Sequence, residues 1–348
     1  MHDGIQRDYV LYVPANYDSN ISVPLILNFH GFGGSGAQQM GNSTFRPIAD
    51  TAGFIIVHPT GTPFNGFVNH WNVGGFTNGS TVDDIGFTAA LIDSLSANYN
   101  INPTRVYSTG FSNGGFFSHR LACELPNRIA AIASVSGTFT PTMQANCSPS
   151  HPTPVLQIHG TTDPTVPYDG TTGNGGMASV DSVIDYWVST NNCDTTPTTT
   201  ALPDINTNDG STVERSIYAG GDAGVSVELL KIIGGAHRWP VPSNTNANQD
   251  INASLEIWKF FSKYANTAVS TKSIDKKNFK IYPNPTNDYL RVEIPTSEKV
   301  MYELKTITGQ SVSSGKLTSG QSKISFSSLP TGFYVLLLDG QAFKIRKD

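Results

Sequence analysis

The sequence has 348 residues, 38% of them hydrophobic and 14% charged, and a formal net charge of −5. This composition predicts a soluble globular protein with one large and one smaller domain. It gives no sign of a basic nucleic-acid-binding surface or of the run of about 18 apolar residues needed to span a membrane. The N-terminal stretch MHDGIQRDYVLYVP lacks the apolar core of a signal peptide, so the protein is either cytosolic or an exported protein whose signal has been removed.

Strand-like and helix-like segments alternate along the first two-thirds of the chain. The run VPLILNFHG is continuously apolar and stops at glycine, as expected for a strand buried in a parallel sheet. Other segments carry apolar residues at helical spacing, and the alternation predicts a mainly parallel sheet with helices on both faces. We expect strands at 8–13, 23–31, 53–59, 105–110, 128–137, 153–160 and 226–235, and helices at 83–99, 113–125, 177–190 and 251–261.

The apolar spacing also predicts which side of each helix is buried. We expect the buried faces to contain Ile85, Ala89, Ile92, Leu95 and Tyr99 in the first long helix, Val180, Ile184 and Trp187 in the third, and Ile251, Leu255, Trp258 and Phe261 in the last. Asp83 and Asp84 are expected to cap the first of these helices. We expect no metal there, because no His or Cys cluster accompanies the two carboxylates in the sequence.

The pattern changes after about residue 266. The segment NTAVSTKSIDKKN is polar and aperiodic, which indicates a linker. Only strand-like runs separated by turn residues follow it, which predicts a small all-β sandwich. The expected domains are therefore 1–266, a linker at 267–277, and 278–348.

The stretch YSTGFSNGG places Ser112 between Gly110 and Gly114. A sharp turn from strand to helix strains the backbone of a nucleophile, and residues two positions before and after it must be small to avoid collisions. Here a β-rich run precedes the serine and an amphipathic helix follows, which is the context of a nucleophile elbow. Ser112 is therefore the predicted nucleophile, with an ordinary tight turn as the alternative.

A serine hydroxyl needs a base, and hydrolases of this kind order their triad Ser, acid, His along the chain. His237, in GGAHRWP, is the only histidine beyond residue 159 and follows the last predicted core strand. Asp163, in HGTTDPTVPY, follows the preceding core strand and is the predicted acid, with Asp169 in reserve. The alternatives are a turn aspartate at 163 and a partly buried loop histidine at 237.

Ester hydrolysis also needs hydrogen-bond donors for the developing oxyanion. The backbone amide of Asn113, which follows the nucleophile, is one expected donor. The loop HGFGGSG follows an early strand and supplies the second, for which we choose Phe32, with Gly31 and Gly33 as alternatives. A phosphate-binding role for this loop is weak, because neither GK[ST] nor GxGxxG spacing is present.

The tryptophans and cysteines leave two further points open. Trp71 and Trp239 lie in predicted loops at the carboxyl side of the sheet and are candidates for an aromatic substrate pocket, or for plain loop packing. Cys123 and Cys147 flank one strand and either pair or remain free, while Cys193 is left over. A disulfide would point to an oxidising compartment.

Several of these motifs recur in order in a known family. RDYVLYVPANYD, HGFGG, HWN, VDDIGF, RVYSTGFSNGG, LACELPNRIAAIASVSG, HGTTDPTVPY and GGAHRWP resemble secreted polyhydroxybutyrate-depolymerase-like esterases, a group close to feruloyl and acetyl xylan esterases. The resemblance covers about residues 5–264 and implies an α/β-hydrolase fold with a triad of Ser112, Asp163 and His237. The family more often has Gly-His-Thr-Trp-Pro where this chain has GGAHRWP, and Arg238 would alter the rim of the pocket.

The C-terminal part resembles a second family. YPNPTNDYL, the ITGQ turn and SLPTGFYVLLL are similar to the C-terminal sorting domain of type IX secretion, over about residues 275–348. The resemblance implies export across a Gram-negative outer membrane and contact with the type IX machinery. The alternative is an ordinary sandwich that binds carbohydrate or spaces the enzyme.

The sequence thus predicts a secreted or cell-surface carboxylic-ester hydrolase that needs no metal or organic cofactor. Feruloylated or acetylated polysaccharide and aliphatic polyester are the expected substrates, with synthetic aromatic polyester as a further one. The rivals are a serine peptidase of the same fold and a secreted carbohydrate-binding protein with an inactive hydrolase fold.

Overall fold

The computed structural model describes residues 1–173, 175–266, 279–294, 300–306, 311–318, 320–338 and 341–348. The chain divides into two compact units, residues 1–269 and residues 270–348. The linker expected at 267–277 lies outside the described residues.

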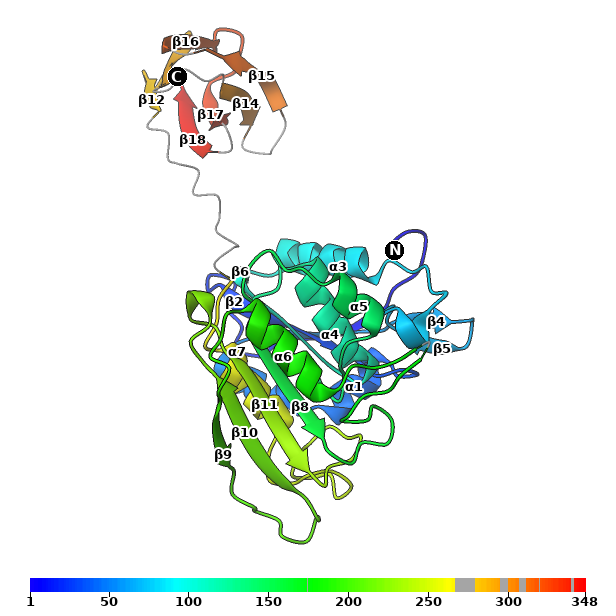
Figure 1. Ribbon diagram of the computed structural model, residues 1–348. Helices are drawn as coiled ribbons and strands as arrows, with labels where there is room; N and C mark the ends of the chain where they lie inside the picture. Colours follow the sequence, from blue (N-terminus) through cyan, green and yellow to red (C-terminus); the bar gives the residue numbers. More distant parts are fainter. Residues whose placement is uncertain (174, 267–278, 295–299, 307–310, 319, 339–340) are drawn as a thin grey trace. The chain divides into compact units, whose positions relative to one another are not determined.

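A nine-stranded sheet forms the centre of the first unit, in the order β1-β3-β2-β6-β7-β8-β11-β10-β9 (Figure 1). The strands from β3 to β11 in this order are parallel, while β1 at one edge and the hairpin β9–β10 at the other are antiparallel. The seven expected strands are present, and the hairpin is an addition. The bounds are β1 Tyr9–Tyr12, β2 Val23–Phe29, β3 Ile55–Pro59, β6 Ile101–Phe111, β7 Ala131–Val135, β8 Val155–Gly160, β9 Thr198–Ala201, β10 Thr212–Tyr218 and β11 Val227–Ile233.

Helices cover both faces of this sheet, as the alternating pattern predicts. Alternate residues of β2 enter two separate cores: Leu25 and Leu27 pack with α3, α4 and α6, whereas Ile26 packs with α2 and α7. The short helices α1, α2 and α5 and the hairpin β4–β5 are additional to the expected elements. The bounds are α1 Gly36–Asn42, α2 Phe45–Ala52, α3 Asp84–Asn98, α4 Asn113–Glu124, α5 Pro141–Asn146, α6 Val180–Thr190, α7 Ala253–Phe261, β4 Thr62–Phe64 and β5 Val68–His70, with 3₁₀ turns at Gly75–Thr77 and Asp222–Gly224.

The predicted buried faces are right for α6 and partly wrong for α3 and α7. In α7 the buried side chains are Ile257, Phe260 and Phe261, whereas Leu255 is 38% exposed. In α3, Phe87 and Leu91 join the core. The predicted buried faces were counted at helical spacing from Ile85 in α3 and from Ile251 in α7. Ile85 lies in the first turn of α3 and is only half-buried, and Ile251 precedes α7. The residues counted from them therefore lie partly to one side of the face that is buried.

A disulfide joins Cys123, near the end of α4, to Cys147, which caps the C-terminus of α5. β7 lies between the two cysteines, as expected. Cys193 is free and buried. The bond therefore ties the helix that follows Ser112 to a neighbouring short helix, and it suits an oxidising compartment.

The C-terminal unit is an all-β sandwich, as predicted. A three-stranded sheet, β12-β13-β16, and a four-stranded sheet, β15-β14-β17-β18, contain only antiparallel pairs. Both sheets supply one core, with Leu290 from β13 and Leu304 and Leu336 from the other sheet. The bounds are β12 Lys280–Tyr282, β13 Tyr289–Ile294, β14 Val300–Thr306, β15 Ser311–Leu317, β16 Gly320–Ser325, β17 Gly332–Leu338 and β18 Gln341–Lys347. Across the described parts of both units, every helix is too short or too polar to cross a bilayer.

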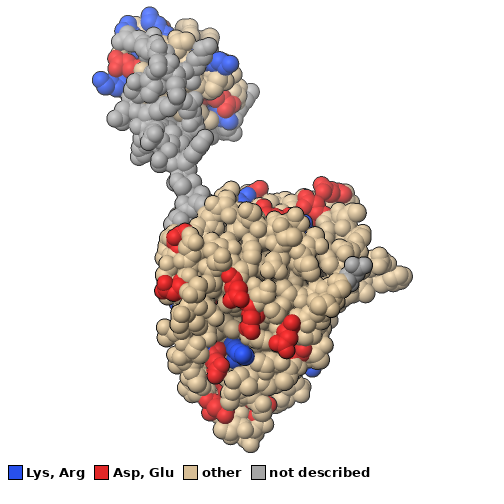
Figure 2. All heavy atoms as spheres, in the orientation of Figure 1, with Lys and Arg blue, Asp and Glu red and all other residues tan. Residues whose placement is uncertain are grey.

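The two units carry opposite net charges. Residues 1–269 contain 10 Lys and Arg and 20 Asp and Glu, a net charge of −10. Residues 270–348 contain 12 Lys and Arg and 7 Asp and Glu, a net charge of +5. Figure 2 shows acidic side chains predominating on the visible face of the first unit and several basic ones on the second.

Candidate active site

Ser112 lies at the sharp turn between β6 and α4. Its backbone has φ 52° and ψ −120°, a region that residues other than glycine rarely occupy. The Ser112 amide donates to the carbonyl of Val135 at 2.8 Å, and the Ser112 carbonyl accepts from the amides of Gly115 and Phe116. These bonds hold the strained residue between strand and helix, which is the elbow conformation predicted from the sequence.

Gly110 and Gly114 are required for the steric reason that the sequence predicts. A Cβ at Gly110 would lie 2.4 Å from the backbone carbon of Gly114, and a Cβ at Gly114 would lie 2.2 Å from the carbonyl oxygen of Phe29. The atoms that would be struck belong to the backbone, so no side-chain rotation can relieve the overlap. The elbow therefore depends on glycine at both positions.

Gly114→Ala should lower the free energy of unfolding by about 3 kcal/mol, because the strand or the helix must move to admit the methyl group. Gly41→Ala is the matched control, since nothing lies within 4 Å of a Cβ at that helical position. Urea denaturation of the two variants measures the difference. Equal stabilities would contradict the close approach of α4 to β2.

Asp163 and His237 form a hydrogen-bonded pair. His237 Nδ1 lies 2.7 Å from Asp163 Oδ2, and the other carboxylate oxygen accepts from the amides of Thr165 and Val166 at 2.8 Å each. Burial alone would raise the pKa of Asp163, but the hydrogen bonds from His237 and the two amides outweigh burial and hold the pKa below its usual range. The carboxylate is therefore ionised and oriented toward the imidazole. Asp169, the reserve acid, is exposed.

His237 lies beside the elbow. Its ring packs on Phe111, the residue before Ser112, with 4.7 Å between ring centroids. Among the hydrogen bonds of the described residues, none joins the Ser112 hydroxyl to His237. Such serine–histidine bonds are often long until substrate binds. The arrangement thus places Ser112, His237 and Asp163 in loops at the carboxyl ends of β6, β11 and β8, respectively.

The glycine-rich loop after β2 lies against the nucleophile. A Cβ at Gly31 would lie 3.3 Å from the Cβ of Ser112. The amide of Gly33 already donates to the carbonyl of Asn69 at 2.8 Å, so Gly33 is not a suitable oxyanion donor. Asn113 is the first residue of α4, where backbone amides have no partner within the helix. Phe32 and Asn113 stay the preferred donors, with Gly31 as the alternative to Phe32.

Trp71 is not a pocket residue, which corrects the prediction. Its side chain is completely buried and stacks on Phe117 with 5.2 Å between ring centroids. Its indole donates to the carbonyl of His30 at 3.0 Å, and its backbone exchanges two hydrogen bonds with the Asn113 side chain, at 2.7 and 3.0 Å. Trp71 therefore ties the glycine-rich loop to the start of α4. Sequence spacing could not show this, because the contact spans 42 residues.

Trp239 stays a candidate pocket residue, because it lines a cavity beside His237. It is almost fully buried, packs on Phe45 and donates to Ser254 Oγ at 3.3 Å. Its edge contributes to a cavity of about 350 Å³ beside His237. Arg238 is exposed and lines the same cavity. Most of Trp239 is thus packed in the core, while part of it forms the cavity wall.

A second cavity, of about 620 Å³, adjoins the first and is lined by the glycine-rich loop and Phe111. Phe32 is 45% exposed here, and its ring makes edge contacts with Phe64 and Phe76, at 6.2 and 6.3 Å between centroids. Phe67, at the tip of the β4–β5 hairpin, is 90% exposed. We call Phe32, Phe64 and Phe76 the aromatic wall. Sequence periodicity does not indicate it, because the rings come from three separate short segments: the loop after β2, the end of β4 and the 3₁₀ turn Gly75–Thr77.

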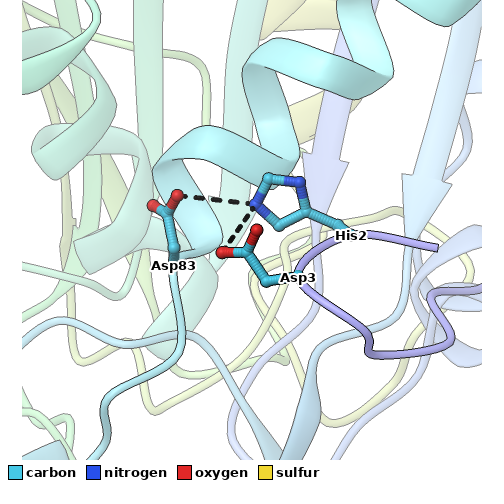
Figure 3. A group of neighbouring side chains, drawn as sticks. All are labelled: His2, Asp3 and Asp83. Carbon is cyan, nitrogen blue, oxygen red and sulfur yellow. Dashed lines mark hydrogen bonds and ion pairs between the residues drawn. The ribbon is translucent and has the colours of Figure 1, made fainter.

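Asp83 caps α3, as expected, whereas Asp84 is the first residue of that helix and makes no capping bond. Asp83 accepts from the amide of Gly86 at 2.8 Å, while its second oxygen lies 3.4 Å from His2 Nε2 (Figure 3). Asp84 is fully buried and pairs with Arg7 at 2.7 Å. Figure 3 also shows Asp3, at 3.7 Å from His2. These ion pairs attach the N-terminal turn to α3, and the sequence missed His2 because it lies 81 residues from Asp83.

Comparison with protein families identifies two domains. Residues 21–173 match the phospholipase/carboxylesterase family, and residues 280–347 match the secretion system C-terminal sorting domain. A solved acetyl xylan esterase from Aspergillus awamori superposes with a TM-score of 0.52 at 18% identity, covering 74% of this chain and 94% of that one. The first unit therefore has the α/β-hydrolase fold.

The curated relatives align with smaller parts of this chain and of their own sequences. A bifunctional acetylxylan esterase/xylanase from Neocallimastix patriciarum is 32% identical over 49% of this chain and 23% of its own length. A putative esterase from Nocardia uniformis subsp. tsuyamanensis is 30% identical over 62% and 65%, and feruloyl esterase B from Piromyces equi is 29% identical over 66% and 42%. The chain thus spans less than two-thirds of each of these relatives. The expected resemblance to feruloyl and acetyl xylan esterases is confirmed.

Proposed function

We propose that this chain, with its carboxylesterase-family domain and its sorting domain, is an exported serine carboxylic-ester hydrolase acting on bulky or polymeric esters. The observation that carries the proposal is the strained elbow at Ser112 beside the hydrogen-bonded pair of Asp163 and His237. A positive φ at a serine flanked by obligatory glycines has a cost in stability that folding alone does not require.

The proposed reaction uses groups of the protein and water. His237 takes the proton of Ser112 as its oxygen attacks the ester carbonyl. Asp163 keeps the proton of the neutral imidazole on Nδ1 and stabilises the imidazolium that forms. Amides of Phe32 and Asn113 donate to the oxyanion. His237 returns the proton to the leaving alcohol, and water activated by His237 then hydrolyses the acyl-enzyme.

A fluorophosphonate probe tests this function directly, because it reacts covalently with an activated serine. We expect the probe to label wild-type protein at Ser112 and to leave Ser112→Ala unlabelled, as read by mass spectrometry of the peptide. Absence of label on the wild type would favour the alternative of an inactive, carbohydrate-binding hydrolase fold.

The aromatic wall is an argument for a substrate ester that carries a flat apolar group. Phe32 borders both the proposed oxyanion site and the larger cavity, so a ring attached to the reacting carbonyl, or to the alcohol, could pack on it. Acetyl groups are too small to use this surface. Feruloylated polysaccharide is therefore the first proposed substrate, ahead of acetylated polysaccharide, aliphatic polyester and synthetic aromatic polyester.

The ratio of kcat/KM for methyl ferulate to that for a short 3-hydroxybutyrate oligomer should favour ferulate. Phe32→Leu keeps the backbone amide and should lower the ferulate value by about 3- to 10-fold while leaving the oligomer value nearly unchanged, because the ring that lines the larger cavity is lost and an aromatic pair contributes about 0.5–1.5 kcal/mol. Phe333→Leu is the control, since Phe333 is 46% exposed in the C-terminal unit. A ratio favouring the oligomer in the wild type would instead indicate a polyester depolymerase.

The match of residues 280–347 to a sorting domain supports export, and we propose the type IX machinery as its partner and a secreted or cell-surface location. The disulfide between Cys123 and Cys147 suits this location. When each is expressed behind an N-terminal export signal, the full-length protein should appear outside the outer membrane, whereas a chain ending before residue 270 should stay in the periplasm.

A further inference from the structure

A buried hydrogen-bond chain runs through the first unit beneath the proposed catalytic acid. It begins at Trp187 on α6, whose indole lies 3.1 Å from His119 Nδ1 on α4. His119 Nε2 lies 3.2 Å from Gln157 Oε1 on β8. Gln157 Nε2 lies 2.8 Å from the carbonyl of Gly137 and 3.1 Å from His159 Nδ1. The four side chains are almost completely inaccessible to solvent.

The hydrogen-bond partners determine which nitrogen of each histidine carries its proton and which way the Gln157 amide points. An indole can only donate, so His119 accepts at Nδ1 and, as a neutral ring, carries its proton on Nε2. The carbonyl of Gly137 can only accept, so the Gln157 amide nitrogen faces it and also donates to His159 Nδ1. His159 is therefore protonated at Nε2, and this group donates to the carbonyl of Val166 at 2.8 Å. Burial lowers the pKa of both histidines, which keeps the rings neutral.

This series of hydrogen bonds ends at the turn that contains Asp163. Val166 receives the hydrogen bond from His159 at its carbonyl and donates its own amide to Asp163 Oδ1 at 2.8 Å. His159 Nε2 also lies 3.6 Å from Asp163 Oδ2, the oxygen that binds His237 at 2.7 Å. The same N–H group therefore lies beside both the backbone and the carboxylate of the turn.

We propose that His159 is a positioning residue that sets the orientation of Asp163 by holding Val166, and that Gln157 and His119 connect this turn to the helix that follows Ser112. His119 lies on α4, seven residues after the nucleophile, so the chain joins the element that carries the nucleophile to the loop that carries the acid. The inference rests on the proposed esterase function. It adds a residue that acts through Asp163 and does not touch substrate.

Two substitutions at residue 159 distinguish the effect of the hydrogen-bond donor to Val166 from the effect of changing a buried side chain. The amide nitrogen of glutamine can occupy the place of imidazole Nε2, so His159→Gln keeps the donor to Val166. The shorter asparagine reaches only the place of Nδ1, so His159→Asn keeps the contact to Gln157 and loses that donor. His58→Asn is the control, because His58 is equally buried, lies on β3 and has neither ring nitrogen hydrogen-bonded.

The experiment measures kcat per active site, with sites titrated by fluorophosphonate so that unfolded protein is not counted. His159→Asn should lower kcat by about 10²-fold at nearly unchanged KM, the size of effect expected when a catalytic group is misplaced by about 1 Å. His159→Gln should stay within about threefold of the wild type, as should His58→Asn. The thermal midpoint of each variant reports folding independently of activity.

Wild-type kcat per titrated site in His159→Asn would overturn the positioning role, and so would equal losses in the Asn and Gln variants. Failure of the proposed function is seen separately, in the wild type itself. A wild-type protein that the probe does not label would overturn both proposals, whereas a labelled wild type with an unaffected Asn variant would overturn only this one.

Discussion

Replacement of Ser112 by alanine should reduce kcat/KM for methyl ferulate by about 10⁵- to 10⁶-fold, the loss typical of removing the nucleophile of a serine hydrolase. The hydroxyl makes no hydrogen bond that supports the fold among the described contacts, so the far-UV circular dichroism and the thermal midpoint should stay close to those of the wild type. A variant that retained activity would remove Ser112 from the mechanism.

Ser112→Gly supplies a matched control with a different stability. It should be as inactive as the alanine variant but more stable by about 1 kcal/mol, because φ 52° is strained for alanine and open to glycine. Urea denaturation of the two inactive proteins measures this difference without interference from catalysis. Equal or reversed stabilities would contradict the strained elbow.

Asp163→Asn should lower kcat by about 10⁴-fold while leaving KM nearly unchanged. The asparagine can still accept from the amides of Thr165 and Val166 on its oxygen, which turns its NH₂ group toward His237 Nδ1. The imidazole must then accept at Nδ1 and carry its proton on Nε2, where it cannot take the proton of Ser112. Asp169→Asn is the control and should keep wild-type activity, because Asp169 is exposed.

The same carboxylate predicts a pH dependence of stability. Hydrogen bonds lower the folded-state pKa of Asp163 below its unfolded value of about 3.9. The stability that this carboxylate contributes is therefore fully present above that unfolded value and is lost as the pH falls through the folded pKa. The stability gap between the wild type and Asp163→Asn should stay nearly constant from about pH 7 to about pH 5 and shrink as the pH falls below about 4. A gap that widened on acidification would contradict the lowered pKa.

Structural features that depend only on residues close together in the sequence were predictable. Gly110 and Gly114 must be small for steric reasons confined to the elbow, and the continuous apolar run of β2 reflects burial on both faces of the sheet. Asp163 and His237 were assigned from chain order and from their places after predicted core strands, and the structure brings the two side chains together.

Features set by contacts between distant segments were not predictable. Trp71 looks like a loop residue until its bonds to His30 and Asn113 are known. The role of His159 was not predictable either, although Gln157 and Val166 lie close to it in the chain, because these hydrogen bonds depend on how β8 and the turn after it fold. Short helices such as α1, with seven residues, have too few turns for an apolar period to appear.

The opposite charges of the two units bear on where the enzyme would work after export. Joined, the units form a molecule of modest net charge with a cationic end, which anionic surfaces attract over about a Debye length, roughly 8 Å at physiological salt. Separated from residues 270–348, the first unit would carry −10, so polymers rich in uronic acid would repel it and neutral hemicellulose or polyester would not. Cleavage between the units would therefore change the net charge of the molecule that carries Ser112 from −5 to −10 and favour its binding to uncharged substrates.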